Sequence, residues 1–187
     1  MAATKKPKAK VKEWYSIISP KIFGEVEVGK TLSSDPEKLV GRRIKISLLE
    51  LTNNYNKFYV KFIFRIKKVE GTKALAEFDG SEVMQDYISR MILRRVRRID
   101  TVQDLRTKDG INIRIKGLAI ISRRIKSSIM GRIRNQIRDM MKDEVENSNF
   151  DDFVENIISD ELKGRILRTT RQTYPVRNFE IRKTELL

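Results

Sequence analysis

Hydrophobic and polar residues alternate between residues 42 and 79 with the period of two that is typical of β-strands. Two such runs, 44–48 and 58–66, are followed by a turn at Gly71 and by a third run around residues 74–78. Glycine accepts the positive φ that tight turns require, so Gly71 marks a reversal of the chain. The pattern therefore predicts an antiparallel meander.

The chain then changes to helical spacing and back to alternation. Residues 83–94 show the three-to-four-residue spacing of a short helix. Segments 96–105 and 111–122 flank Asp109-Gly110, a pair that favours the sharp turn of a β-hairpin. A second hairpin is predicted here.

The clearest helix is predicted at about 127–145, where isoleucine and methionine side chains recur on one face. Helical spacing at 150–158 predicts another helix, with 162–169 as its candidate continuation. A closing strand is predicted at about 176–182. Helices thus dominate the last third of the chain.

These patterns predict an α+β fold whose antiparallel sheet forms a partly or fully closed β-barrel-like core with flanking helices. Residues 1–13 carry five lysines without hydrophobic periodicity, so we expect a flexible, disordered basic N-terminal arm. The 187 residues, 40% of them hydrophobic, suit one hydrophobic core. Residues 14–187 are therefore predicted to form a single domain.

Charge is distributed in blocks along the chain. Lysine and arginine number 40 against 25 aspartates and glutamates, which gives a formal net charge of +15. Residues 90–138 hold fifteen basic side chains and three aspartates, whereas 139–162 hold nine acidic side chains and one lysine. A basic excess of this size favours a polyanionic partner, with nucleic acid as the first candidate. The acidic segment is expected to meet water, a basic protein neighbour or the chain's own arginines.

The candidate RNA contacts are the basic side chains around the second hairpin and the long helix, together with the N-terminal lysines. A guanidinium group binds phosphate oxygens in a planar fork and stacks on bases, which suits folded RNA. The alternative to RNA contact is that the arginines lie on solvated helix faces and that the lysines form a loose solubilising tail. The predicted set is Lys5, Lys6, Lys8, Lys10, Lys12, Arg94, Arg95, Arg97, Arg98, Arg123, Arg124, Lys126, Arg132, Arg134 and Arg138.

Other candidate contacts are better explained by structure. Trp14 and Tyr15 could stack on an exposed base, but an aromatic pair at the start of a domain more often packs on the core. A further set of basic residues lies on the predicted strands. Strands with one face in water routinely carry such residues, so we expect this set to contact water and not RNA. That set is Lys57, Lys61, Arg65, Lys67, Arg114 and Lys116.

Composition excludes most enzyme classes. The sequence has no cysteine and no histidine, which removes thiol nucleophiles, zinc ribbons and histidine acid–base chemistry. It has no GxxxxGK[ST] phosphate loop. A magnesium-dependent nuclease would need Asp100, Asp104 and Asp109, or else Asp151 and Asp152, to hold the metal. Such scattered carboxylates are ordinary, and Asp109 is better explained by its turn. We therefore predict no enzyme activity, no cofactor and no small-molecule substrate.

The sequence also gives no sign of a membrane protein. No stretch approaches the roughly 20 apolar residues of a membrane span, and no signal-peptide pattern opens the chain. We therefore expect a soluble protein without a membrane partner.

A series of motifs resembles a known family. Between Lys12 and Lys183 the chain contains, in order, KEWYSIISPKIFG, VGKTL, GRRIKISLLEL, a KDG turn, RNQIRDMMKDEV and TYPVRNFEIRK. This combination resembles the S-three-Ae (e-type S-one) family of archaeal and eukaryotic small ribosomal subunit proteins, in its archaeal-length form. The resemblance implies a β-barrel-like core on the platform of the small subunit, near the messenger exit and neighbouring ribosomal proteins.

Charge and resemblance together predict a structural constituent of the small ribosomal subunit, cytoplasmic and ribosome-bound. Arginine and lysine contacts to phosphate would bind small-subunit rRNA and so support translation. Neighbouring small-subunit proteins are expected partners, and messenger RNA near the exit is a further candidate. A free-standing RNA-binding translation regulator is the alternative, and a metal-dependent nuclease is a weaker one.

Overall fold

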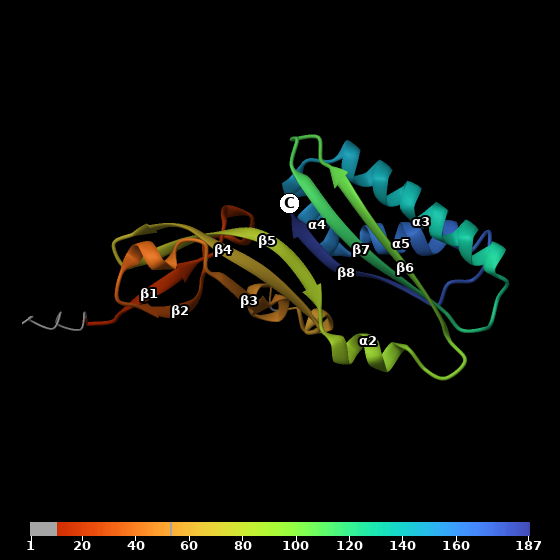
Figure 1. Cartoon of the computed structure of the whole chain (residues 1–187), viewed down its shortest axis with the longest axis horizontal. Coiled ribbons are helices and arrows are strands. Elements are labelled where there is room, and N and C mark those ends of the chain that lie inside the picture. Colours follow the sequence, from red (N-terminus) through yellow and green to blue (C-terminus); the bar gives the residue numbers. More distant parts are fainter. Residues whose placement is uncertain (1–10, 53) are drawn as a thin grey trace, which may run out of the picture.

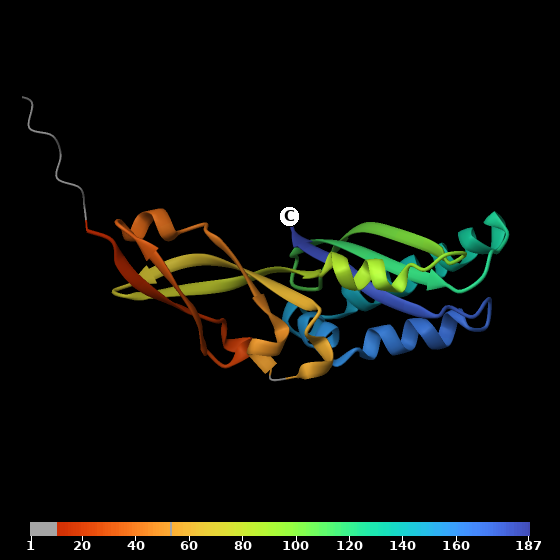
Figure 2. The ribbon, with the colours of Figure 1, turned by 90° about the horizontal axis from the view of Figure 1, so that it is seen from below.

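The computed structural model describes residues 11–52 and 54–187 of an elongated molecule (Figure 1 and Figure 2). In chain order its elements are β1 (Glu13–Ile18), η1 (Lys21–Phe23), β2 (Glu27–Ser33), η2 (Pro36–Leu39), β3 (Arg43–Ser47), α1 (Leu48–Thr52), η3 (Tyr55–Lys57), β4 (Val60–Glu70), β5 (Lys73–Val83), α2 (Gln85–Met91), β6 (Arg97–Arg106), β7 (Asn112–Ile121), α3 (Ser127–Asn147), α4 (Phe150–Ser159), α5 (Glu161–Thr170) and β8 (Asn178–Leu186). Figure 1 shows β1–β5 in one half and β6–β8 with α3–α5 in the other.

The strands form one branched sheet. Within the described residues, eight strands are hydrogen-bonded in the order β2-β1-β5-β8-β7-β6, with β4 on the other edge of β5 and β3 beyond β4. One edge of β5 pairs first with β1, over 73–75, and then with β8, over 80–82. The β1–β5 pairing is parallel and the others are antiparallel. β5 therefore links the two halves.

The sheet does not close into a barrel. In the described part of the chain, β2, β3 and β6 each pair with a single neighbouring strand and remain edges. The α+β class is therefore confirmed, whereas the predicted barrel-like closure is not. Alternation of hydrophobic and polar residues indicates that each strand has one buried and one solvent-exposed face. Open sheets and barrels share this property, so alternation does not distinguish them. The branch at β5 instead divides the strands between two halves.

Each half has its own hydrophobic cluster among the described residues. In the first, Phe62 and Phe64 pack against Phe78 with edge-to-face ring geometry. The second cluster lies between β6–β8 and the helices α3–α5. α4 contributes to both, because Phe153 belongs to the second cluster and Val154 to the first. The helical layer thus packs on both halves.

α3 covers the range predicted for the long helix. Ile133, Ile137, Met141 and Val145 recur every four residues, and none is more than 1% exposed. This stripe belongs to the second cluster, and α3 lies over β6. Burying one such side chain contributes about 1.5–3 kcal/mol, so tertiary packing stabilises the helix more than its intrinsic propensity does.

The turn between β6 and β7 also fixes the start of α4. Gly110 has a φ of 84°, and its N–H donates to the Thr107 carbonyl oxygen at 2.9 Å. The Asp109 carboxylate accepts a hydrogen bond from the Phe150 N–H at 2.8 Å, at the first residue of α4. A carboxylate is favourable at a helix N-terminus, so Asp109 caps α4 from another element.

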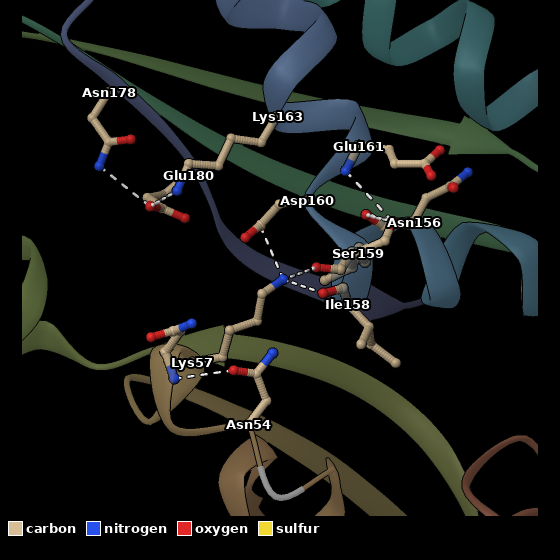
Figure 3. Close-up of polar contacts among 12 residues, drawn as sticks. Asn54, Lys57, Asn156, Ile158, Ser159, Asp160, Glu161, Lys163, Asn178 and Glu180 are labelled. Carbon is tan, nitrogen blue, oxygen red and sulfur yellow. Dashed lines mark hydrogen bonds and ion pairs between the residues drawn. The ribbon is translucent and has the colours of Figure 1, made fainter.

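A buried lysine connects η3 to the end of α4 (Figure 3). The Lys57 side chain is only 6% exposed, and its Nζ donates to the carbonyl oxygens of Ile157, at 3.1 Å, and Ile158. The same ammonium group lies 3.0 Å from Asp160 Oδ1. The last carbonyls of a helix carry its negative dipole end, so this is a favourable position for a cation.

A second ion pair, which is partly buried, lies beside it. Lys163 Nζ is 2.6 Å from Glu180 Oε1, and the Tyr87 hydroxyl donates to the same oxygen at 3.4 Å. The Tyr87 ring stacks on Tyr59 with 3.7 Å between centroids. Burial and then the nearby Glu180 carboxylate raise the pKa of Tyr59, so its phenol stays neutral. These contacts connect α2 and the start of β4 to α5 and β8.

The crossing of β5 and β8 has no room for a side chain at Gly80. A Cβ there would collide with the Thr184 carbonyl oxygen. We expect Gly80→Ala to lower the free energy of unfolding, measured in urea, by about 2 kcal/mol. Gly131→Ala is the matched control: in α3 a new Cβ meets no described atom within 4 Å apart from its chain neighbours and its own helix backbone, so this change should raise stability by about 0.5–1 kcal/mol. Equal effects would contradict the close approach.

Lys57→Met tests the contact between η3 and α4. The change leaves two helix-terminal carbonyls and Asp160 without their cation, so we expect a loss of about 2–4 kcal/mol in unfolding free energy. Lys67→Met removes an exposed lysine that lies 2.5 Å from Glu77 and should change stability little. Thermal and urea unfolding would measure both. A Lys57 variant as stable as the Lys67 variant would show that the contact is dispensable.

Candidate nucleic-acid interface

The connections α2–β6, β7–α3 and α5–β8 meet at the end of the molecule opposite β1 (Figure 1 and Figure 2). Strand register explains this arrangement. Arg97, the first residue of β6, pairs with Ile121, the last residue of β7. The backbone N–H of Arg177, just before β8, donates to the Ile120 carbonyl oxygen at 2.8 Å. Residues that flank these contacts are therefore neighbours in space.

Exposed cationic side chains gather on these connections, and we call them the basic end. None of them forms a salt bridge with a residue that the structure describes. Their charges are therefore available to a partner of opposite charge. The basic end consists of Arg94, Arg95, Arg97, Arg123, Arg124, Lys126, Arg171 and Arg177.

Sequence reasoning missed Arg171 and Arg177. The only signal was a return to basic composition after residue 162, which does not indicate where those side chains lie. Arg171 follows α5, and Arg177 is held beside β7 by its backbone hydrogen bond to Ile120. Only the strand order shows that they join the predicted arginines.

Arg98 lies next to the basic end but is neutralised within the chain. Its guanidinium group donates three hydrogen bonds to the Asp100 carboxylate, at 2.7–3.0 Å. A forked pair of this kind satisfies both groups. By contrast, Arg95 has a φ of 70°, a left-handed conformation that is rare outside glycine, and its side chain is exposed. Of these two predicted contacts, Arg95 is the one free to bind.

Arg132, Arg134 and Arg138 are exposed along α3. Arg134 and Arg138 are one helical turn apart and share a side of the helix, whereas Arg132 projects from a different side. The backbone carbonyl of Arg138 accepts a hydrogen bond from Gln103 of β6 at 3.2 Å, so this turn of the helix lies beside the edge strand. The structure therefore does not bring the three arginines onto one face.

Of the five N-terminal candidates, the structure describes Lys12 alone. Lys5, Lys6, Lys8 and Lys10 lie outside the described residues. Lys12 is exposed and precedes β1, at the opposite end of the molecule from the basic end (Figure 1). The structure therefore does not bring Lys12 together with the predicted arginines.

Trp14 and Tyr15 differ in exposure, although both were predicted to pack on the core. Tyr15 is 5% exposed and belongs to the first hydrophobic cluster, as predicted. Trp14 is 64% exposed and pairs across β1–β2 with the partly exposed Leu32, so the packing prediction was wrong for Trp14. The alternation of β1 explains the difference, because adjacent residues face opposite sides of the sheet.

Basic residues on the strands are mostly compensated by carboxylates. Arg65 lies 2.8 Å from Asp79 Oδ1, and Arg114 lies 2.6 Å from Asp104 Oδ1. Hydrogen bonds from Lys116 and then from Lys183 lower the pKa of Glu185 to about 2. Lys67 pairs with Glu77. These contacts favour the solvated-face interpretation of the strands over an RNA platform. The solvated-face prediction was wrong for Lys57, which lies in η3 and is only 5% exposed.

The carboxylates of the nuclease alternative have structural partners. Asp100 binds Arg98, Asp104 binds Arg114, and Asp109 caps α4. Hydrogen bonding to Arg114 lowers the pKa of Asp104, which keeps this ion pair charged. Among the described residues, no group of three or more acidic side chains could hold a metal ion. The same residues contain no helix long and apolar enough to cross a membrane.

Three known proteins are similar to this chain over most of its length. The chain is 39% identical to "Small ribosomal subunit protein eS1" of Methanopyrus kandleri over 184 residues, which cover 96% of this chain and 87% of that protein. It is 37% identical to the protein of the same name from Sulfurisphaera tokodaii over 182 residues, 97% of this chain and 94% of the relative. The protein of that name from Saccharolobus islandicus strain L.S.2.15 is 36% identical over 184 residues, 98% of this chain and 88% of its own length.

The family comparison covers nearly the whole chain. Residues 2–187 match the family model "Ribosomal S3Ae family". This match confirms the resemblance that the sequence motifs indicated. Ribosomal relatives also support the prediction that the protein is not an enzyme. The chain belongs to the Ribosomal S3Ae family.

Proposed function

We propose that this chain is a structural constituent of the small ribosomal subunit and binds small-subunit rRNA through its basic end. Family membership and the names of the relatives support the ribosomal part of the proposal. Assembly into ribosomes accounts for the expected cytoplasmic, ribosome-bound location and for a role in supporting translation. The rRNA contact rests on the charges of the folded chain.

The observation that carries the rRNA contact is the unequal compensation of charge. Cations on the strands, such as Arg65 and Arg114, lie within 2.8 Å of carboxylate oxygens. The exposed cations of the basic end have no such partner among the described residues. Mutual repulsion among them is unfavourable in the free protein, and a polyanion relieves it.

The charge order along α3 supports the same conclusion. A helix dipole favours acidic residues at the N-terminus and basic residues at the C-terminus. α3 has the reverse arrangement: its first turn has no acidic residue and its last turn no basic one, and Lys126 occupies the N-cap without a side-chain cap hydrogen bond. Glu144 and Glu146 lie near the C-terminus instead. The arrangement is unfavourable for the isolated helix and favourable when phosphate approaches its N-terminus.

Binding of this kind depends on phosphates more than on bases. Guanidinium groups on several connections would contact the backbone of a folded RNA and release its counterions. A-form helices hide most base edges from side chains, so shape and phosphate spacing would determine the fit. The protein would thereby hold RNA segments in a fixed arrangement.

A second, acidic surface lies on the helical layer between α3 and α5. A groove of about 390 Å³ between α3 and α5 is lined by Asp143, Glu144 and Arg165, among others. Carboxylates there would repel phosphate, so this side is proposed to face a basic neighbouring ribosomal protein. The platform position near the messenger exit, with messenger RNA as a candidate contact, comes from the family resemblance alone.

A simple experiment distinguishes a ribosomal constituent from the alternative, a free-standing RNA-binding translation regulator. Cell extract is sedimented through a sucrose gradient in high salt, and the chain is detected in each fraction. We expect stoichiometric amounts in the small-subunit peak. Detection only in the light fractions would favour the regulator. The uncompensated basic end is compatible with either protein, and no observation favours the nuclease.

Neutralising the basic end should weaken RNA binding in a salt-dependent way. We expect the triple change Arg97→Gln, Arg123→Gln and Arg124→Gln to lower affinity for a small-subunit rRNA fragment about 10- to 100-fold at low salt. The slope of log affinity against log salt should fall by about 2–3, at roughly 0.9 per phosphate for duplex DNA. Filter binding across a salt series measures both quantities.

A matched triple variant loses the same number of charges elsewhere. Lys67→Gln, Arg114→Gln and Lys116→Gln remove lysine and arginine charges that face carboxylates on the strands. This variant should keep nearly the full salt slope. Equal losses in both variants would show that total charge, and not the basic end, determines binding.

Lys126→Asp should separate stability from binding. An N-cap aspartate satisfies a free N–H and agrees with the helix dipole, so the free energy of unfolding should rise by about 1 kcal/mol. RNA affinity should fall about tenfold or more, because a cation of the basic end becomes an anion. Urea unfolding and filter binding on the same preparation test both signs. Unchanged affinity would remove Lys126 from the interface.

A further inference from the structure

An open pocket of about 580 Å³ lies inside the basic end. This volume is in the range of about 300–1,000 Å³ that is typical of small-molecule sites. The β7–α3 connection supplies one wall and the segment before β8 supplies the other. The lining residues are Ser122, Arg123, Tyr174, Pro175, Val176 and Arg177.

Hydrogen bonds hold the second wall in place. The Tyr174 N–H donates to the carbonyl oxygen of Thr170 at 2.9 Å, in the turn that follows α5. Val176 is only 5% exposed and anchors the segment in the second hydrophobic cluster. The Arg177 N–H donates to Ile120 at 2.8 Å. Proline at 175 further restricts the backbone. A ligand that binds here would therefore lose little free energy to ordering of this segment.

The chemistry of the walls is mixed in a specific way. Arg123 and Arg177 stand on opposite walls, are exposed, and form no salt bridge with any described residue. Tyr174 is partly buried and contributes an aromatic surface, and Val176 adds a hydrophobic one. A nucleotide has the complementary parts, because its base stacks on aromatic rings and its phosphate accepts from guanidinium groups.

We propose that this pocket binds one unpaired nucleotide of the RNA, with its base against Tyr174 and its phosphate between Arg123 and Arg177. The proposal rests on the RNA binding proposed above and adds a preference for a bulged or looped-out residue. A base inside a duplex is stacked on its neighbours and paired, so it cannot enter a pocket. Stacking on an aromatic side chain is tolerant of sequence, so no particular base is required.

The first test compares two RNA hairpins that differ by one bulged nucleotide. Binding of the full chain is measured by fluorescence anisotropy at one salt concentration. The wild-type protein should bind the bulged hairpin about tenfold more tightly, within the range that base–aromatic stacking contributes. Tyr174→Leu should abolish this preference and leave affinity for the paired hairpin within about twofold. Tyr174→Phe keeps the ring and should keep the preference.

Arg171→Gln is the matched control in the same basic end. Arg171 does not line the pocket, so its loss should weaken binding of both hairpins by the same factor and preserve their ratio. Arg177→Gln should instead reduce the ratio, because its guanidinium group is proposed to hold the phosphate of the bulged nucleotide. Equal ratios in the two arginine variants would overturn the proposal.

A measurement on the unmodified protein avoids any doubt about folding of the Tyr174 variants. With 2-aminopurine at the bulged position, stacking on Tyr174 should quench its fluorescence when the protein binds. Unchanged or brighter fluorescence at saturation would overturn the proposal.

Tight but equal binding of both hairpins would also overturn it while leaving the proposed function intact, and the pocket would then suit a carboxylate of a protein partner. Binding of neither hairpin would contradict the proposed function itself.

Discussion

The antiparallel register of β6, β7 and β8 determines where the functional side chains of this protein lie. Pairing of Arg97 with Ile121, and the hydrogen bond from Arg177 to Ile120, bring the ends of separate connections together. The buried isoleucines of α3 hold the helix over β6, so the helix begins at the same end of the sheet. A slip of one residue in this register would exchange buried and exposed faces and disperse the basic end.

Charge compensation distinguishes structural from functional cations here. Lys57 is buried and paired, and it stabilises the contact between η3 and the end of α4. Lys163 is partly buried and pairs with Glu180 between α5 and β8. Many exposed strand cations, such as Arg65, Lys67 and Arg114, face carboxylates. The cations of the basic end lack such partners among the described residues, and Lys126 stands at the unfavourable end of α3. Departures from local stability of this kind are typical of binding surfaces.

Local patterns in the sequence predicted most of the strands and helices after residue 42, but they missed β1 and β2 and did not predict how the strands assemble. Alternation, the Asp109-Gly110 turn and the isoleucine stripe of α3 depend on near neighbours, so they were readable from the chain. The branch at β5 and the burial of Lys57 depend on residues far apart in sequence: Lys57 meets α4 about a hundred positions later. Arg177 was missed for the same reason, and Trp14 because one aromatic residue of a pair must face outward on a strand.

The central claim is that the basic end contacts RNA phosphate. A cryo-electron microscopy structure of the small ribosomal subunit that contains this chain tests it most directly. The account predicts guanidinium groups of Arg97, Arg123 and Arg177 within hydrogen-bond distance of rRNA phosphate oxygens, with the acidic half of α3 turned away from RNA. A basic end that faces solvent or only protein, with rRNA against another surface, would contradict it.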